Sequence, residues 1–321
     1  MDGINLQRIQ DAYERIQQHV KKTPLIQSKA LSDRCGGEVY LKLENQQHTN
    51  TFKFRGAINK MAGLSPDQAS KGVVTASSGN HAQGAALAAQ TLGIHATIFV
   101  PREVSPMKLE KLQKYDVDIV IGGGFNQVEA NARKHGEKHG LTYISPYNDY
   151  SIMAGQGTIA LELDDQLDDF DSVIVPVGGG GLISGIAVGV KSLHPDRNVF
   201  GVLTPGASTI HASLEAGKLV VVEEFETLAE AFLGGIEPEA LTFDVIKKYV
   251  DDVLLVQEES VAEAIRILWN EEKQIVEGAG ATSSALILEQ KERFEGKRVV
   301  VVVSGGNISE SLFSKIIGSS E

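Results

Sequence analysis

Short apolar runs alternate with longer amphipathic segments along most of this chain. Short apolar runs predict strands, and apolar residues that recur at helical spacing predict helices. We expect strands at 39–43, 73–76, 96–100, 117–121, 173–177, 199–202, 252–256 and 298–303. We expect helices at 6–20, 53–64, 79–92, 106–115, 125–139, 155–167, 182–193, 260–272 and 308–317. Strands that alternate with helices at this spacing indicate βαβ units and a parallel sheet, whereas the stretch 204–241 has no readable pattern.

The composition narrows the class of protein. The chain has 321 residues, of which 42% are hydrophobic and 22% are charged. This profile is typical of a soluble globular protein with two ordinary domains or one large doubly wound sheet. A net charge of −12 argues against nucleic acid or an anionic membrane as a partner. No apolar run approaches the ~20 residues that span a membrane. The single cysteine, Cys35, and the lack of an apolar signal segment predict a reducing, cytoplasmic location.

The stretch 51–56 reads TFKFRG and places Lys53 between Phe52 and Phe54 at the start of an expected helix. Burial beside apolar groups lowers the pKa of a lysine and frees the lone pair that Schiff-base chemistry needs. Taken alone, the pattern is more typical of a solvated surface lysine. A catalytic role for Lys53 therefore depends on what the rest of the chain supplies.

A run of four glycines, Gly178–Gly181, lies between an expected buried strand and an expected helix. Ligands of open α/β sheets bind at the carboxyl ends of the strands, so this position is a candidate site. Four glycines let backbone N–H groups turn toward an anion, and a helix N-terminus adds positive potential. The alternative is a flexible turn. The spacing matches neither a dinucleotide motif nor a P-loop, so a phosphate is favoured over a nucleotide.

Two turns that contain serine and asparagine follow other expected strands. The first reads SSGNH at 77–81, and the second reads SGGN at 304–307. The first turn suits a carboxylate or a ring oxygen of a ligand. Serine and asparagine are also ordinary helix caps, so either turn can be a simple capped turn. His135 and His139 lie four residues apart among lysines, and we interpret them as a solvated helix face rather than a metal pair.

The order of these stretches resembles the fold type II pyridoxal-phosphate enzymes, and within them the threonine/serine dehydratase and serine racemase branch. The resemblance covers nearly the whole chain and includes AGQGT at 154–158 and VEGAG at 276–280. It implies two open, mostly parallel twisted α/β sheets with helices on both faces. It also implies a large cofactor-binding domain formed by 1–50 and 150–321, a small domain formed by 51–149, and a homodimer.

The resemblance assigns cofactor-binding roles to the matching residues. Lys53 would bond pyridoxal 5'-phosphate covalently, and Phe52 would pack beside the ring. Asn80 would hydrogen-bond the phenolic oxygen, and Ser304 would face the pyridine nitrogen. The phosphate would be bound by the backbone N–H groups of Gly178, Gly179, Gly180, Gly181 and Leu182.

Other residues are assigned to the substrate, which is implied to be a small amino acid. Ser77, Ser78 and His81 would lie at the substrate carboxylate, with His81 as a hydrogen-bonding support rather than a base. Glu277 would lie near the cofactor without a defined role. Metal-binding members usually have a glutamate after the strand expected at 199–202. This chain has Leu203 there, so no divalent metal site is expected.

The implied reaction is β-elimination of a β-hydroxy L-amino acid, L-threonine or L-serine, to a 2-oxo acid and ammonia. A serine at the pyridine nitrogen does not hold that nitrogen protonated, which favours elimination. Two alternatives stay open. One is a serine racemase with dehydratase side activity, in which Ser78 would be a catalytic proton donor opposite Lys53. The other is a dehydratase of a 3-substituted serine such as 3-hydroxyaspartate.

Overall fold

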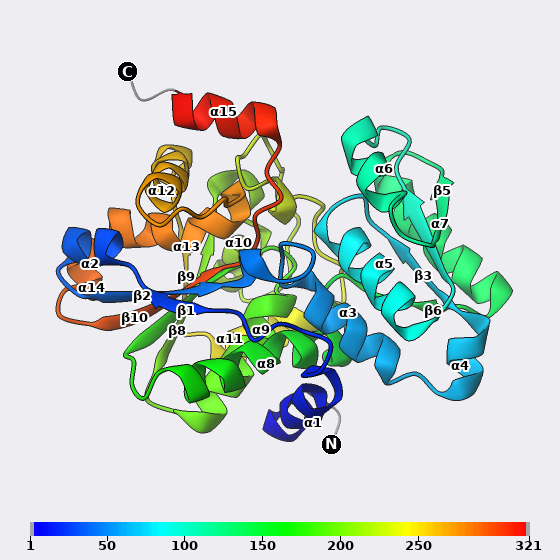
Figure 1. Cartoon of the computed structure of the whole chain (residues 1–321), viewed down its shortest axis with the longest axis horizontal. Helices are drawn as coiled ribbons and strands as arrows, with labels where there is room; N and C mark the ends of the chain where they lie inside the picture. The colour runs from blue at the N-terminus through cyan, green and yellow to red at the C-terminus, as the bar shows by residue number, and fades with distance from the viewer. Residues whose placement is uncertain (1–2, 319–321) are drawn as a thin grey trace.

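The computed structural model describes residues 3–318 and contains two separate sheets, which lie side by side in Figure 1. The larger sheet has six strands in the order β1-β2-β10-β7-β8-β9. Only β1 runs antiparallel to its neighbour. The strands are β1 (Leu25–Gln27), β2 (Glu38–Leu43), β7 (Ser172–Pro176), β8 (Asn198–Leu203), β9 (Asp252–Leu255) and β10 (Arg298–Val303).

The smaller sheet is entirely parallel, with the order β5-β4-β3-β6. Its strands are β3 (Val73–Ala76), β4 (Ala96–Val100), β5 (Asp118–Ile121) and β6 (Thr142–Tyr143). The α/β class with two mostly parallel sheets is thus confirmed. All strands of the smaller sheet fall within 51–149 and all strands of the larger sheet fall outside it. The division of the chain into two domains itself stays a prediction.

Helices cover both faces of both sheets, as Figure 1 shows. In the first half of the chain they are α1 (Leu6–Ile16), α2 (Lys29–Cys35), α3 (Lys53–Ala62), α4 (Pro66–Lys71), α5 (Asn80–Leu92), α6 (Pro106–Leu112), α7 (Phe125–His139) and α8 (Tyr150–Gln166). In the second half they are α9 (Gly181–Leu193), α10 (Thr209–Ala216), α11 (Leu241–Tyr249), α12 (Glu258–Asn270), α13 (Gly278–Glu289), α14 (Lys291–Phe294) and α15 (Glu310–Gly318). Short 3-10 turns occupy η1 (Glu44–Gln46), η2 (Pro205–Ala207) and η3 (Glu230–Phe232).

The valine run of β10 shows why the central strands are apolar throughout. Val299, Val301 and Val303 pack with α2, α12 and α13 on one face of the larger sheet. Val300 and Val302 pack with α8 and α9 on the other face. Because successive side chains point to opposite faces, a strand covered on both sides needs an unbroken apolar sequence. Burying this strand fixes Ser304, the residue after it, at the carboxyl edge of the sheet.

Helix α3 lies between the two sheets and contacts elements of both (Figure 1). Helices α5 and α8 can pack close to α3 because each has a glycine where it contacts the α3 backbone. A Cβ on Gly155 of α8 would lie 2.6 Å from the Arg55 carbonyl oxygen. A Cβ on Gly84 of α5 would lie 3.0 Å from the backbone of Lys53 and Phe54. The first turn of α3, which carries Lys53, is therefore held closely from both sides.

Candidate active site

Lys53 is the first residue of α3, and its side chain is only partly exposed. Its Nζ donates a hydrogen bond to the carbonyl oxygen of Pro146 at 2.9 Å. The same nitrogen lies 5.1 Å from the centre of the Phe52 ring. Burial lowers the pKa of Lys53 to about 8, and the charge of Glu277 offsets only part of this effect. A substantial fraction of the amine is therefore neutral near physiological pH, as a nucleophile or a base requires.

The glycine loop joins β7 to α9 at the carboxyl edge of the larger sheet. Gly180 has a φ of +86° and precedes α9, and no side chain caps this helix. A Cβ on Gly179 would lie 2.4 Å from the ring of Tyr147, and a Cβ on Gly180 would lie 2.7 Å from Ile246. The loop is thus restricted to glycine, and the first N–H groups of α9 are left for a ligand. These features fit an anion cradle.

Asn80 and Glu277 meet in a chain of hydrogen bonds. The Asn80 amide donates to Glu277 Oε1 at 2.7 Å. Asn307 Nδ2 donates to Asn80 Oδ1 at 2.8 Å and to the Thr49 carbonyl oxygen at 2.9 Å. Burial raises the pKa of Glu277 to about 7, although the bond from Asn80 opposes this. These bonds fix the orientation of the Asn80 side chain. Near neutral pH the Glu277 carboxyl is a mixture of its protonated and ionised forms.

Ser304 connects β10 to the lysine stretch. Its carbonyl oxygen accepts hydrogen bonds from the Phe52 N–H and the Thr51 hydroxyl, both at 3.2 Å. Thr51 also forms a bridge with Gly305. The stretches 51–56 and 304–307, far apart in the sequence, are therefore neighbours in the structure. Together with Asn80 and Glu277 they form one group around Lys53.

The turn at 77–81 contributes two accessible serines and one buried histidine. The Ser77 hydroxyl accepts from the Gly79 N–H at 3.2 Å. Ser78 is partly exposed and lines a pocket of about 350 Å³ whose other lining residues lie outside the group around Lys53: Pro101, Glu103, Val104, Ser105 and Lys108. His81 Nε2 lies 3.0 Å from Thr75 Oγ1 and 3.1 Å from the Ile144 carbonyl oxygen. Burial, with a smaller contribution from Lys53, lowers the pKa of His81 to about 3. A neutral, hydrogen-bonded His81 has the character of a support, while its place at a substrate carboxylate stays a prediction.

Three features of the site were not predicted from the sequence. They are the Pro146 carbonyl that accepts from Lys53, the Tyr147 ring against the glycine loop, and the bond between Asn80 and Glu277. For Glu277 the only signal was the shared stretch VEGAG at 276–280, which the resemblance places near the cofactor. No comparable signal marks Pro146 or Tyr147, which lie in an irregular segment.

Leu203, the position considered for a metal ligand, is the last residue of β8 and is buried in an apolar cluster. Within residues 3–318 no group of three or more histidine, cysteine, aspartate or glutamate side chains could hold a metal ion. In the same range no helix has both the length and the apolar character to cross a membrane.

Magnesium, calcium or a chelator is expected to shift the melting temperature by less than ~1 °C, because Leu203 offers no oxygen to a hard cation. A specific site filled at about 100 times its Kd would add about 2.7 kcal/mol and shift the melting temperature by several degrees. Differential scanning fluorimetry across a metal titration measures this. A stabilisation that saturates with metal would mean that another ligand set exists.

The chain is similar to known proteins in sequence and in fold. Residues 16–305 match the family model described as "Pyridoxal-phosphate dependent enzyme". The chain is 44% identical to the L-threonine ammonia-lyase of Thermotoga maritima, over 98% of this chain and 78% of that protein. It is 41% identical to the catabolic L-threonine dehydratase of Staphylococcus aureus strain N315, over 98% and 92% of the two chains. The structure of maize serine racemase matches with a TM-score of 0.93 and 33% identity, covering 98% of this chain and 96% of that one.

Proposed function

Because this chain belongs to the family of pyridoxal-phosphate dependent enzymes, we propose that it is an ammonia-lyase for a β-hydroxy L-amino acid. The substrate is L-threonine or L-serine, and the products are a 2-oxo acid and ammonia. The relatives named for L-threonine support this substrate class. The observation that carries the proposal is Lys53, a partly exposed lysine beside Asn80, Glu277 and the 304–307 turn, with a pKa lowered to about 8.

The residues present fit the cofactor. The loop Gly178–Gly181 and the first turn of α9, including Leu182, would bind the phosphate, since a Cβ would not fit there and the helix has no side-chain cap. Lys53 would attach to the aldehyde, and Phe52 would form a wall of the site. Asn80 would hydrogen-bond the phenolic oxygen of the ring, and Ser304 would face the ring nitrogen. When bound, pyridoxal phosphate supplies an electron sink for the charge that develops on the substrate α-carbon.

The protein groups then have separate tasks. Lys53 Nζ removes the α-proton, for which a pKa of about 8 is suitable near neutral pH. The substrate carboxylate is bound by Ser77, Ser78 and the N-terminal end of α5. His81 supports this turn through its contacts with Thr75 and the Ile144 carbonyl oxygen. Ser304 offers a hydroxyl rather than a carboxylate, so it does not hold a ring nitrogen protonated. An unprotonated ring nitrogen is a weaker electron sink, so rapid loss of the β-hydroxyl is favoured over prolonged storage of negative charge at the α-carbon.

A substrate panel tests the proposal. The protein reconstituted with pyridoxal phosphate is assayed for 2-oxo acid with L-threonine, L-serine, 3-hydroxyaspartate and phenylserine. Turnover of L-threonine or L-serine above the other two is expected. Turnover confined to 3-hydroxyaspartate or phenylserine would replace the substrate, and no 2-oxo acid from any of them would overturn the function.

Racemisation of serine is a second candidate activity, with Ser78 as its proton donor. The Ser78 side chain does not cap α5, whose N-cap is Gly79, and it is partly exposed. Its hydroxyl is therefore free of a helix-capping role, and in this activity it would donate a proton on the face of the substrate opposite Lys53. The similarity to maize serine racemase supports the same possibility.

Ser78→Ala is expected to reduce D-serine formation from L-serine by roughly 10²-fold, which is within the contribution of one general acid. Elimination needs a proton transfer on one face only, so 2-oxo acid formation should fall much less. The melting temperature should hardly change, since no cap is lost. Chiral chromatography of the reaction mixture measures both products. Equal loss of both activities would leave Ser78 with substrate binding as its only role, and no D-serine from the wild type would exclude the racemase component.

We also propose that the enzyme is a cytoplasmic homodimer. The single cysteine supports a reducing compartment. Size-exclusion chromatography with light scattering tests the dimer, and a monomeric mass at assay concentration would contradict it.

A further inference from the structure

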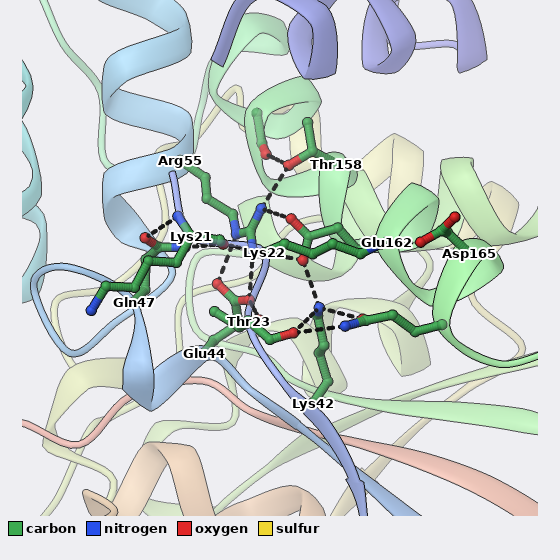
Figure 2. A network of polar contacts seen from close by, with 12 residues as sticks. Lys21, Lys22, Thr23, Lys42, Glu44, Gln47, Arg55, Thr158, Glu162 and Asp165 are labelled. Atoms are coloured by element: carbon green, nitrogen blue, oxygen red, sulfur yellow. Dashed lines mark hydrogen bonds and ion pairs between the residues drawn. The ribbon is translucent and has the colours of Figure 1, made fainter. Parts of the chain in front are cut away.

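Four charged side chains form a fully buried cluster beneath the first turn of α3 (Figure 2). Arg55, Lys42 and Glu44 are 0% exposed, and Glu162 is 1% exposed. Figure 2 shows the Arg55 guanidinium between the carboxylates of Glu44 and Glu162. Two positive and two negative charges cancel, so the cluster can be buried as a unit.

Every N–H group of Arg55 has an acceptor. Nε and Nη2 donate to the two oxygens of Glu44 at 2.8 and 2.9 Å. Nη1 and Nη2 donate to the two oxygens of Glu162 at 2.6 and 3.0 Å. Nη1 also donates to Thr158 Oγ1 at 3.2 Å, and Nη2 to the Lys21 carbonyl oxygen at 3.1 Å. The planar fork of arginine is needed for this pattern, because an ammonium donates from a single point.

Lys42 completes the cluster from the larger sheet. Its three N–H groups donate to Glu162 at 2.5 Å, Gln166 at 2.7 Å and the Thr23 carbonyl oxygen at 2.8 Å. Burial lowers the pKa of Lys42, which the carboxylates of Glu162 and Glu44 partly offset. Although burial would raise the pKa of Glu44, the charge of Arg55 holds it below its ordinary value. The charged forms therefore depend on one another.

The cluster joins parts of the chain that lie far apart in sequence. Glu44 belongs to η1, which directly follows β2, and Glu162 belongs to α8. Arg55 is the only one of the four charged residues on α3, two positions after Lys53. A shift of the Arg55 backbone would therefore move Lys53 within the same helical turn. Buried ion pairs often add little net stability over apolar packing, so a geometric role accounts better for this cluster than stability does.

We propose that Arg55 is a positioning residue, which fixes the first turn of α3 against η1 and α8 so that Lys53 Nζ reaches the reacting atoms. This inference rests on the proposed function, in which Lys53 attaches the cofactor and removes the α-proton. Arg55 itself touches neither. Its effect passes through the backbone of α3, which Gly155 and Gly84 leave closely packed on both sides.

Arg55→Lys is the direct test, because it keeps the charge and removes the fork. A displacement of about 1 Å can cost about 10²-fold in rate, so kcat should fall by roughly that factor while KM changes by less than ~3-fold. A second readout needs no turnover. Apoprotein is acetylated across a pH series, and mass spectrometry of the Lys53 peptide gives the pKa of Lys53. In Arg55→Lys this pKa should rise from about 8 toward its ordinary value of 10.5, because a loosened turn admits water.

Lys60→Met is the matched control. Lys60 lies on the same helix and pairs with Asp149, the N-cap of α8, at 2.6 Å. Its loss removes an ion pair between the same two helices away from Lys53. Compared at temperatures equally far below their melting points, Lys60→Met should keep the kcat and the Lys53 pKa of the wild type.

The outcomes separate the two proposals. If Arg55→Lys lowers the melting temperature but keeps kcat and the Lys53 pKa, the cluster is structural only and the inference is overturned. If the wild type forms no 2-oxo acid while Arg55→Lys still raises the Lys53 pKa, the proposed function fails and the positioning role stands. If Arg55→Lys does not fold, Thr158→Val gives the same test. It removes the hydrogen bond that Nη1 donates to Thr158 Oγ1, together with the bond from that hydroxyl to the Gly155 carbonyl oxygen, and it keeps all four charges. A several-fold loss of kcat is expected there, and an unchanged Lys53 pKa and kcat would again overturn the inference.

Discussion

Lys53→Ala is expected to lower the formation of 2-oxo acid by roughly 10³-fold or more and to abolish covalent attachment of the cofactor. One general base alone contributes about 10²–10⁴-fold, and the variant also loses the attachment point. The residual rate is measured by 2-oxo acid formation with saturating cofactor and L-threonine. Covalent attachment is measured by borohydride reduction followed by mass spectrometry of the Lys53 peptide.

The same variant should reveal the cost of burying a lysine charge. In the folded apoprotein the pKa of Lys53 is about 8, below the ordinary 10.5. Between these two pH values the unfolded chain binds more protons than the folded chain, so stability rises with pH there. Below pH 8 the full cost is present, on the order of 3 kcal/mol. The free energy of unfolding of Lys53→Ala apoprotein should therefore exceed that of wild-type apoprotein most at neutral pH. The difference between the two should shrink as the pH rises from about 8 to 10.5.

Lys60→Ala serves as the control for this experiment, because it removes a lysine from the other end of α3. It should keep the rate and the covalent attachment. Lys53→Ala with more than a tenth of the wild-type rate would show that another lysine carries the chemistry. A stability difference that does not depend on pH would show that Lys53 is solvated in the folded protein.

The fold could be predicted where the apolar and polar residues follow a single clear pattern. The strands expected at 73–76, 96–100 and 298–303 have those bounds in the structure, because they are apolar runs between turn residues. Helix α13 was not predicted. Its sequence, GAGATSSALILE, is buried on nearly every side and shows no polar face. A helix without a solvent-facing side has no amphipathic pattern to detect. The expected helix at 6–20 ends at Ile16 in the structure, since the segment after it turns toward β1.

The candidate site could be predicted as far as its parts are contiguous in sequence. The glycine loop and the 304–307 turn follow β7 and β10, and parallel strands bring such turns to one edge of the larger sheet. The 77–81 turn follows β3 of the smaller sheet, so its place beside them depends on how the two sheets pack. The residue pairs that orient the site side chains come from distant parts of the sequence. Asn80 and Glu277 are 197 residues apart, and Arg55 and Glu162 are 107 residues apart. Such contacts depend on how α3, α8 and α13 pack, which local patterns do not specify.

Gly179→Asp is expected to weaken pyridoxal phosphate binding by at least ~100-fold, for two physical reasons. A Cβ at this position would lie 2.4 Å from the Tyr147 ring, so the loop or the ring must move. The new carboxylate would also repel a bound phosphate, by about 4 kcal/mol for unit charges at 4 Å and an effective dielectric constant of 20. Titration of apoprotein with pyridoxal phosphate, followed by absorbance or by quenching of intrinsic fluorescence, gives the Kd.

Two further variants distinguish the steric cause from the electrostatic one and locate the phosphate. Gly179→Ala adds the Cβ without the charge, so its Kd should fall between those of the wild type and Gly179→Asp. Gly124→Asp places the same charge before α7, in another glycine run, where a Cβ would meet nothing within 4 Å. Because aspartate is a good N-cap, this variant should fold well and bind the cofactor as the wild type does. A weakened Kd in Gly124→Asp together with an unchanged Kd in Gly179→Asp would place the phosphate at the 122–124 run, and the assignment of Gly178–Gly181 would be wrong.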